Sequence, residues 1–385
     1  MEGHRIQAVQ QPIIPTVAEL IRLNPGTISL GQGVVYYGPP PLAFDKIREC
    51  LGDSTTHKYG VVDGESWLRQ AISKKLLVEN LLEVSGKNRI VVTAGSNMGF
   101  YNAILAIADH GDEVILQSPY YFNHEMAVTM AGCKPVLVKT QADFHWNVGK
   151  VADAITEKTK AIVTISPNNP TGAVYSQSTL QNINELCREH GIYHICDEAY
   201  EHFVFEGNRH FSPGSMPHAV NYTISLYSLS KSYGFASWRI GYMVIPEHLY
   251  GAVRKIQDTI LICPPVVSQL VALGATLEGS AYRDERIKII EKVRRSALEK
   301  LKSLGQVIDM PSAEGAFYML LRVHTDQDDM SLLRALITQF RIAAIPGSAF
   351  GIQDGCYFRV AYGSLQQATV EEGMDRLVMG LKTLV

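Results

Sequence analysis

Between residues 88 and 246, short apolar segments alternate with longer stretches of helical character, and this alternation constrains the fold more than any other feature of the sequence. The apolar segments are rich in Val and Ile, as buried strands are, whereas a stretch such as 178–190 has the apolar spacing of an amphipathic helix. This alternation predicts an α/β fold with a mostly parallel, seven-stranded sheet covered by helices. The predicted strands are 90–93, 114–116, 135–138, 161–165, 192–196, 223–227 and 240–245.

The chain beyond residue 246 is dominated by helical patterns, beginning with a long apolar stripe at 285–304. Mixed patterns follow, which suit a smaller α+β domain formed by the N-terminal arm and the C-terminal region. Its predicted elements are strands at 317–321, 342–345 and 357–361 and helices at 16–23, 331–340 and 370–383. We therefore expect residues 1–44 to form an arm and part of the small domain, 45–278 the large domain and 279–385 the rest of the small domain.

Charge and cysteine usage exclude several classes of partner. A net charge of −3 and a pI near 6.5 give no basic surface for nucleic acid or an anionic membrane. No apolar run is long enough for a membrane span, and the start of the chain lacks the pattern of a signal peptide. The six cysteines are scattered without a CxxC pair, so we expect free thiols in the cytoplasm, with neither a zinc site nor disulfides.

Ligands of parallel sheets bind beyond the carboxyl ends of the strands, and polar loops follow several of the predicted strands. Gly95-Ser96-Asn97 stands between a strand and a helix, where free N–H groups and the helix dipole favour a phosphate. An ordinary helix cap by Ser96 explains the same residues. Asn169 lies between two prolines, and its amide can donate to a phenolate oxygen, although such turns are common without a ligand.

Two further loops carry ionisable groups. Asp197 ends a predicted strand, where it either caps the backbone or pairs with a protonated ring nitrogen and keeps a heterocycle cationic. Lys231 follows small hydroxyl residues in what we expect to be a tight turn between two strands. Such a turn would fix its amine and partly desolvate it, as Schiff-base chemistry requires. Ser228 and Arg239 add a hydroxyl and a permanent cation, which suit a bound phosphate.

The order of these motifs, completed by a late arginine in Phe358-Arg359-Val360, resembles the class I and II aminotransferases of pyridoxal-phosphate fold type I over essentially the whole chain. The resemblance implies pyridoxal 5'-phosphate as the cofactor and ping-pong transfer of nitrogen between an amino acid and a 2-oxo acid. Lys231 would form the internal aldimine and move the α-proton, and Asp197 would pair with the pyridinium nitrogen. Asn169 and Tyr200 would hydrogen-bond the phenolic oxygen of the cofactor.

The resemblance also assigns the residues around the cofactor phosphate. Those expected from the same subunit are Ser96, Asn97, Ser228 and Arg239. Tyr59 would reach the phosphate of the neighbouring subunit, which implies a homodimer.

The remaining assignments concern the cofactor ring and the substrate. Tyr121 would stack on the cofactor face, while His124 would either support Asp197 or be an ordinary packed histidine. Arg359 would clamp the substrate carboxylate, assisted by Asn169 and the Gly33 backbone.

Two positions depart from the family pattern. Ser237 stands where the family usually has glycine, and we expect no functional change from it. Asn97 stands where some relatives carry a lysine that recognises acidic side chains. Its presence, with the apolar and aromatic residues 34–37 beside Gly33, favours a neutral, apolar or aromatic donor.

Two other functions remain open at this point. Lyases and synthases of the same fold, such as a carbon–sulfur β-lyase or an aminocyclopropane-carboxylate synthase, share all of these motifs. An effector-binding module of a transcription regulator is the more distant alternative, because it needs a DNA-binding segment and only about 25 residues without a basic cluster precede the first shared motif.

Overall fold

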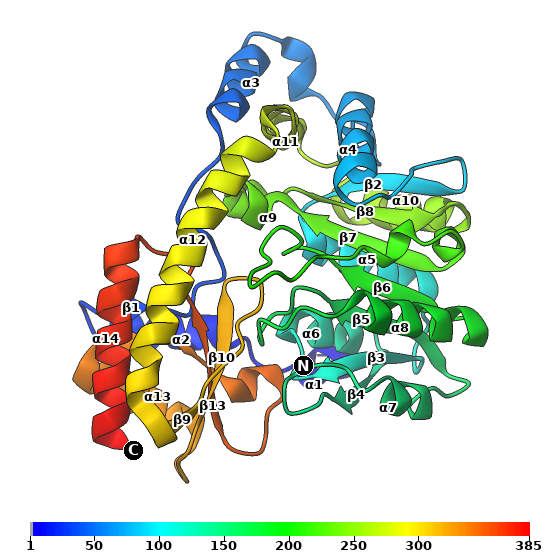
Figure 1. Cartoon of the computed structure of the whole chain (residues 1–385). Coiled ribbons are helices and arrows are strands. Elements are labelled where there is room, and N and C mark those ends of the chain that lie inside the picture. Colours follow the sequence, from blue (N-terminus) through cyan, green and yellow to red (C-terminus); the bar gives the residue numbers. More distant parts are fainter. Residues whose placement is uncertain (1–2) are drawn as a thin grey trace.

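The structure, a computed structural model, describes residues 3–385 and is built around a seven-stranded sheet (Figure 1). The strand order is β2-β8-β7-β6-β5-β3-β4; β8 pairs antiparallel with β2 and β7, and all other neighbouring strands of this sheet pair in parallel. The predicted α/β fold with a mostly parallel sheet is therefore confirmed. The strands are β2 (Asn88–Thr93), β3 (Glu113–Ser118), β4 (Lys134–Lys139), β5 (Thr159–Ile165), β6 (Tyr193–Asp197), β7 (Thr223–Ser228) and β8 (Gly241–Pro246).

Helices cover both faces of this sheet because successive strand residues point to opposite sides. On β2, Val91 packs with the side chains of α5 and α6, whereas Ile90 and Val92 pack with those of α4 and α11. Nearer the β4 edge, α7 and α8 pack on Ile115 and Ile162. The helices around the sheet are α3 (Pro41–Leu51), α4 (Ser66–Glu79), α5 (Ser96–Ile107), α6 (Phe122–Met130), α7 (Val148–Asp153), α8 (Gln177–His190), α10 (Tyr250–Leu261) and α11 (Val266–Glu278).

A second sheet is built from the C-terminal region in the order β12-β13-β10-β9, with all neighbours antiparallel. Its strands are β9 (Ile308–Asp309), β10 (Tyr318–Val323), β12 (Ile345–Pro346) and β13 (Cys356–Ala361). The N-terminal arm joins this region through β1 (Ile28–Ser29), which pairs in parallel with β11 (Ile342–Ala343). The helices of this part are α1 (His4–Ala8), α2 (Ile13–Arg22), α12 (Ser280–Leu301), α13 (Asp329–Phe340) and α14 (Gln367–Leu384), of which α1 contacts α6.

Some predicted boundaries differ from the observed ones for identifiable reasons. The predicted strand 342–345 is two short strands in different sheets, β11 and β12. Helix α12 begins at Ser280, before the predicted residue 285, because its first turns are polar and lack the apolar stripe. Helix α2 begins at Ile13, since a proline such as Pro15 is tolerated in a first helical turn. The predicted domain division after residues 44 and 278 stays a prediction.

The segment that carries Lys231 is not the tight turn that the sequence predicts. Strand β7 ends at Ser228, and α9 (Leu229–Ser232) follows, so Lys231 lies on a short helix. The Ser228 side chain accepts a hydrogen bond from the Ser230 N–H at 3.2 Å, which caps this helix and explains why the chain coils there. The 3₁₀ helices are η1 (Ser54–His57), η2 (Pro213–Ser215), η3 (Ala219–Asn221), η4 (Ala236–Trp238), η5 (Glu247–Leu249), η6 (Lys302–Val307) and η7 (Gly347–Phe350).

Among the described residues, no helix combines the length and apolar character that a bilayer crossing requires. The six cysteines are unpaired, and Cys263 is the only one that is not buried.

Candidate active site

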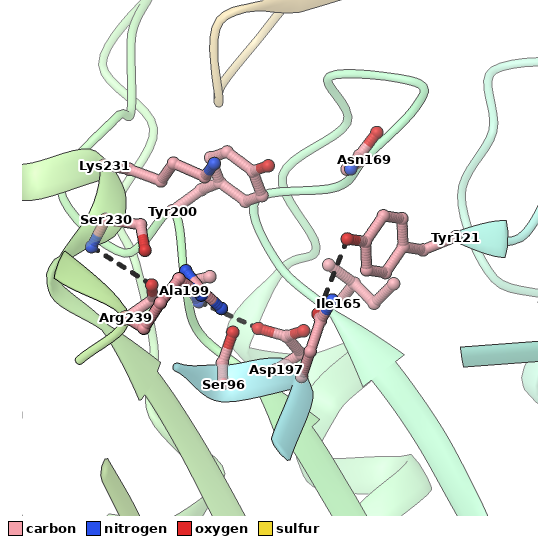
Figure 2. Close-up of a pocket in the computed structure, with 12 residues that line it drawn as sticks. Ser96, Tyr121, Ile165, Asn169, Asp197, Ala199, Tyr200, Ser230, Lys231 and Arg239 are labelled. Carbon is pink, nitrogen blue, oxygen red and sulfur yellow. Dashed lines mark hydrogen bonds between the residues drawn. The ribbon is translucent and has the colours of Figure 1, made fainter. Parts of the chain in front are cut away.

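A cavity opens beyond the carboxyl ends of β5, β6 and β7, where Figure 2 shows the polar side chains converging. Its wall contains every cofactor residue that the resemblance implies except Tyr59, whose side chain is exposed. The lining residues are Ser96, Asn97, Tyr121, Ile165, Asn169, Asp197, Ala199, Tyr200, Ser228, Ser230, Lys231 and Arg239. Sequence reasoning missed Ile165, Ala199 and Ser230, although each adjoins a motif that it identified.

One end of the cavity suits a phosphate. Gly95 caps α5 with φ of 83°, and Ser96 is the first helical residue, so the alternative that Ser96 caps the helix is wrong. The Arg239 guanidinium donates to the carbonyl oxygens of Ala236 at 2.8 Å and Ala94 at 3.4 Å, and no carboxylate of residues 3–385 pairs with it. A Cβ at position 95 would lie 2.3 Å from the guanidinium, so glycine is required for this close approach. Helix N–H groups and an unpaired arginine together form an anion site.

Asp197 lies at the end of β6 and is buried. Its Oδ1 accepts a hydrogen bond from the Ala199 N–H at 3.0 Å, and its Oδ2 lies 3.1 Å from His124 Nε2. The His124 ring is stacked on Phe100 at 3.9 Å and meets the edge of Tyr121 at 5.1 Å. The structure thus places His124 beside Asp197, in the supporting position that the resemblance implies. A protonated aromatic nitrogen in the cavity would find an oriented carboxylate in Asp197.

The Lys231 amine points into the cavity and donates a hydrogen bond to the Gly33 carbonyl oxygen. Burial, and then the neighbouring Arg359 and Arg239 cations, lower the Lys231 pKa from 10.5 to about 8. As a result, the fraction of Lys231 amine that is uncharged at pH 7 rises by about two orders of magnitude. The Tyr37 hydroxyl donates to the Lys231 carbonyl oxygen at 3.0 Å, which fixes α9. The site therefore contains a positioned amine able to attack a carbonyl.

Arg359 projects from β13 and is almost completely buried. Its guanidinium donates to Asn169 Oδ1 at 2.9 Å and to the Gly31 carbonyl oxygen at 2.8 Å, while its Nε has no partner. No carboxylate of residues 3–385 pairs with it. A buried cation without an anion is costly, so this arrangement suits a bound carboxylate. Asn169, which we expect to assist Arg359 in binding the substrate carboxylate, contacts the guanidinium directly, whereas the carbonyl of Gly33 accepts from Lys231; the shared carboxylate role stays a prediction.

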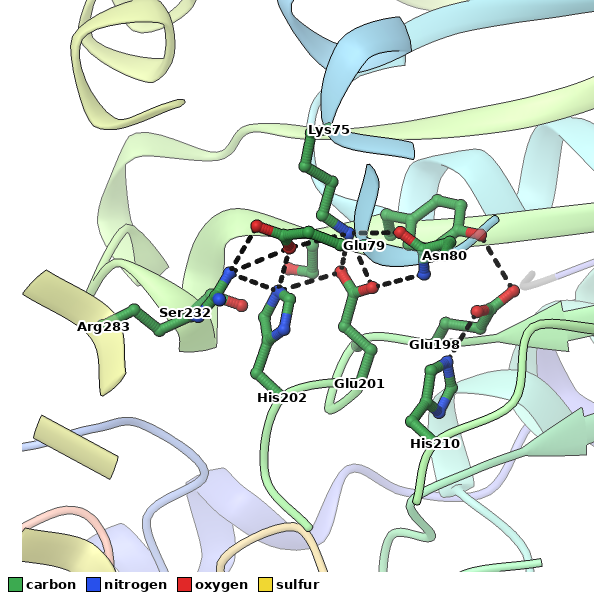
Figure 3. A network of polar contacts seen from close by, with 12 residues as sticks. Lys75, Glu79, Asn80, Glu198, Glu201, His202, His210, Ser232 and Arg283 are labelled. Atoms are coloured by element: carbon green, nitrogen blue, oxygen red, sulfur yellow. Dashed lines mark hydrogen bonds and ion pairs between the residues drawn. The ribbon is translucent and has the colours of Figure 1, made fainter. Parts of the chain in front are cut away.

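Behind the cavity, a buried polar network holds the loop that bears Asp197 and Tyr200 (Figure 3). The Lys75 ammonium donates to both Glu201 carboxylate oxygens at 2.6 Å, and Glu198 accepts from Tyr227 at 3.1 Å. Glu198, Glu201 and His210 bring their ligand atoms within 4.8 Å of one another, a set that could suit a metal ion. Lys75 supplies the compensating cation on the Glu201 side, so the cluster is explained by protein partners alone. Sequence reasoning did not find the wider network, because Lys75 and Tyr227 are far along the chain from Glu198 and Glu201.

The donor set fits pyridoxal 5'-phosphate: N–H groups at a helix N-terminus and an arginine for the phosphate, a carboxylate for a ring nitrogen, and a nucleophilic amine. Fold and site together define an enzyme of the pyridoxal-phosphate fold type I class.

Comparison with known proteins gives the same result. Residues 25–377 match the family model of aminotransferase class I and II. The chain is 33% identical to the aromatic aminotransferase ISS1 of Arabidopsis thaliana, covering all of this chain and 97% of the relative, and 32% identical to an aspartate aminotransferase of Pyrococcus abyssi, covering 91% and 90%. The solved aromatic aminotransferase of Pyrococcus horikoshii superposes with a TM-score of 0.87 at 31% identity, covering 95% of this chain and 99% of the other. The protein belongs to the class I and II aminotransferases, which are pyridoxal-phosphate-dependent and transfer nitrogen between amino acids and 2-oxo acids.

Proposed function

We propose that the donor in this transamination is a neutral amino acid with an aromatic or apolar side chain. The observation that carries the proposal is the charge of the cavity: apart from Lys231 and Arg239, its described lining holds no cation, and the next cation, Arg359, donates to Asn169 of that lining. Each of these three cations has its own proposed task, so none is left for a side-chain carboxylate. Asn97 is neutral where a lysine would serve that purpose. The relatives include both aromatic and aspartate aminotransferases at nearly equal identity, so the proposal depends on the charge of the cavity.

The proposed residue roles are those that the family resemblance implies, and the geometry of the cavity supports them. When bound, pyridoxal phosphate supplies an electrophilic carbon and a ring that accepts the electrons left by α-proton loss. Lys231 would hold the cofactor and, as a neutral amine, would move the proton of the substrate α-carbon. Asp197 would pair with the ring nitrogen and favour its protonated form, while Asn169 and Tyr200 would donate to the phenolic oxygen. Arg359 binds the substrate carboxylate through two parallel hydrogen bonds.

The remaining cavity residues complete the proposed site. Tyr121 would cover the cofactor face, and Ser96, Asn97, Ser228 and Arg239, which also line the cavity, would bind the phosphate.

A panel of donors with 2-oxoglutarate as the acceptor tests the donor class. We expect kcat/KM for phenylalanine or tyrosine to exceed that for aspartate at least tenfold, since an unpaired carboxylate buried in the cavity is disfavoured. A preference for aspartate would show that the donor proposal is wrong. Pyruvate or ammonia released without an acceptor would instead favour a lyase. Binding of amino acids without any turnover would favour the effector-binding module.

We also propose that the enzyme is a cytoplasmic homodimer in which Tyr59 binds the cofactor phosphate of the partner subunit. In the single chain the Tyr59 side chain is 81% exposed and lies outside the cavity wall, and Val61, Ile260 and Ile262 are exposed as well. Exposed apolar side chains such as these suit a subunit interface. The unpaired cysteines support a reducing compartment.

Mixed dimers test the contribution of Tyr59. Tyr59→Ala should weaken cofactor retention, and Lys231→Ala should abolish turnover. In a mixture of the two variants, one site of each hybrid dimer combines an intact Tyr59 with an intact Lys231, so activity should reappear after subunit exchange. If Tyr59 served its own subunit, no hybrid site would be complete and no activity would return.

A further inference from the structure

We propose that Tyr318, on β10, is a positioning residue that holds both Tyr200 and Arg359 in their working geometry and so links the cofactor side of the site to the carboxylate-binding side. The inference rests on the proposed roles of these two residues. Tyr318 does not line the cavity itself, and no sequence motif identified it.

The first contact is with Tyr200. The two hydroxyl oxygens lie 2.9 Å apart, and the two rings meet edge to face at 5.5 Å. Both phenols are buried, and burial raises the pKa of each, that of Tyr318 to about 12, so both are neutral hydrogen-bond donors. If Tyr200 donates to the phenolic oxygen of the cofactor, its own oxygen is free to accept from Tyr318. The chain of donors therefore runs from Tyr318 to Tyr200 to the cofactor oxygen.

The second contact is with Arg359. The guanidinium carbon lies 4.4 Å from the centre of the Tyr318 ring and 5.1 Å from that of Phe350. The two aromatic rings thus contact a cation that has no carboxylate partner among the described residues. Aromatic faces attract a guanidinium, and this attraction is stronger away from water. Tyr318 therefore orients the fork of Arg359 before a substrate carboxylate arrives.

Strand register explains how one side chain reaches both groups. In the antiparallel pair β10–β13, Tyr318 is opposite Ala361 and Leu320 is opposite Arg359, so Tyr318 is the diagonal neighbour of Arg359 on one face. The chain two residues before Tyr318 is held as well, because the Ala316 N–H donates to the carbonyl oxygen of Phe203, close to Tyr200 in the chain, at 2.8 Å.

Gly33 is the third element of the arrangement. A Cβ at position 33 would lie 2.9 Å from the Tyr318 hydroxyl oxygen, so the absence of a side chain lets this hydroxyl approach the arm. The Gly33 carbonyl is also the acceptor for the Lys231 amine. The Tyr318 hydroxyl consequently lies next to Tyr200 and beside the backbone that holds the lysine.

Two substitutions separate the hydroxyl from the ring. Tyr318→Phe removes only the donor to Tyr200, which weakens the donation from Tyr200 to the phenolate form of the bound cofactor. The near-visible absorbance of the holoenzyme should then titrate at a pH about half a unit higher than in the wild type, because a hydrogen bond that acts through an intermediate donor transmits part of its free energy. Affinity for an α-methyl amino acid, which binds but has no α-proton to lose, should change less than twofold, since the ring over Arg359 remains.

Tyr318→Leu removes the ring as well. It should shift the absorbance titration in the same direction and also weaken binding of the α-methyl amino acid about thirtyfold, the amount expected for a desolvated cation–π contact. Tyr175→Phe is the matched control. Tyr175 is equally buried, and its hydroxyl donates to Gln117 outside the cavity, so this variant should leave both the titration and the affinity unchanged.

The outcomes are separable from those that test the proposed function. A wild-type protein that binds no pyridoxal phosphate would overturn the proposed residue roles themselves. A wild-type holoenzyme with a normal titration, beside a Tyr318→Phe variant whose midpoint is unchanged, would overturn only this inference. The same holds if Tyr175→Phe shifts the midpoint as much as Tyr318→Phe, because the effect would then be a general response to a lost buried hydroxyl.

Discussion

Replacing Lys231 by methionine should make the cofactor-free protein more stable while it abolishes turnover. Folding lowers the pKa of Lys231 from 10.5 to about 8, chiefly through burial. At 1.36 kcal/mol per pKa unit, keeping this amine charged in the fold costs about 3 kcal/mol at neutral pH. Loss of the hydrogen bond to the Gly33 carbonyl offsets about 1 kcal/mol of the gain. Lys231→Met should therefore be more stable by about 2 kcal/mol at pH 7.

The pH dependence of this difference is the specific part of the prediction. Because the folded pKa lies below the unfolded one, the unfolded chain binds more protons between about pH 8 and 10.5, and the wild type gains stability as the pH rises through that window. Below pH 8 the folded protein bears the full free-energy cost of keeping the Lys231 amine charged. The advantage of Lys231→Met should accordingly be largest at pH 7 and should shrink by more than half at pH 9.5.

Urea unfolding of the cofactor-free proteins, followed by tryptophan fluorescence at both pH values, measures this difference. Lys288→Met is the matched control, because Lys288 is exposed on α12 and its loss should change the stability little at either pH. Equal or lower stability of Lys231→Met at pH 7, or an advantage of the same size at pH 9.5, would refute the claim that the fold forces this amine toward its neutral form.

Three further predictions concern ligand binding. Arg359→Leu should lower kcat/KM by about 10²-fold or more with every 2-oxo acid, because each substrate carboxylate loses a bidentate partner. Steady-state kinetics measure kcat/KM, and an unchanged kcat/KM would show that Arg359 does not bind the carboxylate. Asp197→Asn should lower kcat by about 10²-fold or more while pyridoxal phosphate still binds, since the neutral amide no longer favours a protonated ring nitrogen. Single-turnover absorbance changes measure the rate, and a near-normal rate would contradict this role of Asp197. Gly95→Ala should weaken pyridoxal-phosphate affinity about tenfold or more, because the added Cβ would collide with the Arg239 guanidinium. Fluorescence titration measures this affinity. Gly86→Ala is the control, because a Cβ at position 86 meets open space.

The sequence by itself determined the α/β architecture, the seven strands and the residue types of the cavity. These follow from local patterns: apolar strands alternating with helices, and polar loops placed after strands whose carboxyl ends must meet at one edge. Asp197 could be identified in this way because it comes directly after the predicted strand 192–196, and Asn169 because it lies in the loop that follows the predicted strand 161–165. The order of the motifs then added the resemblance that gave each residue a role.

Tertiary structure decided what depends on pairing between distant segments. The register of β10 against β13 places Tyr318 beside Arg359, and no local pattern encodes that register. The short helix under Lys231 arises from capping by Ser228, where sequence reasoning expected a tight turn. The low pKa of Lys231 depends on burial and on two arginines from other parts of the chain. Desolvation and the distances between charges exist only once the chain has folded. The chemistry of the site could therefore be named from the sequence, but the shifted pKa of its lysine could not.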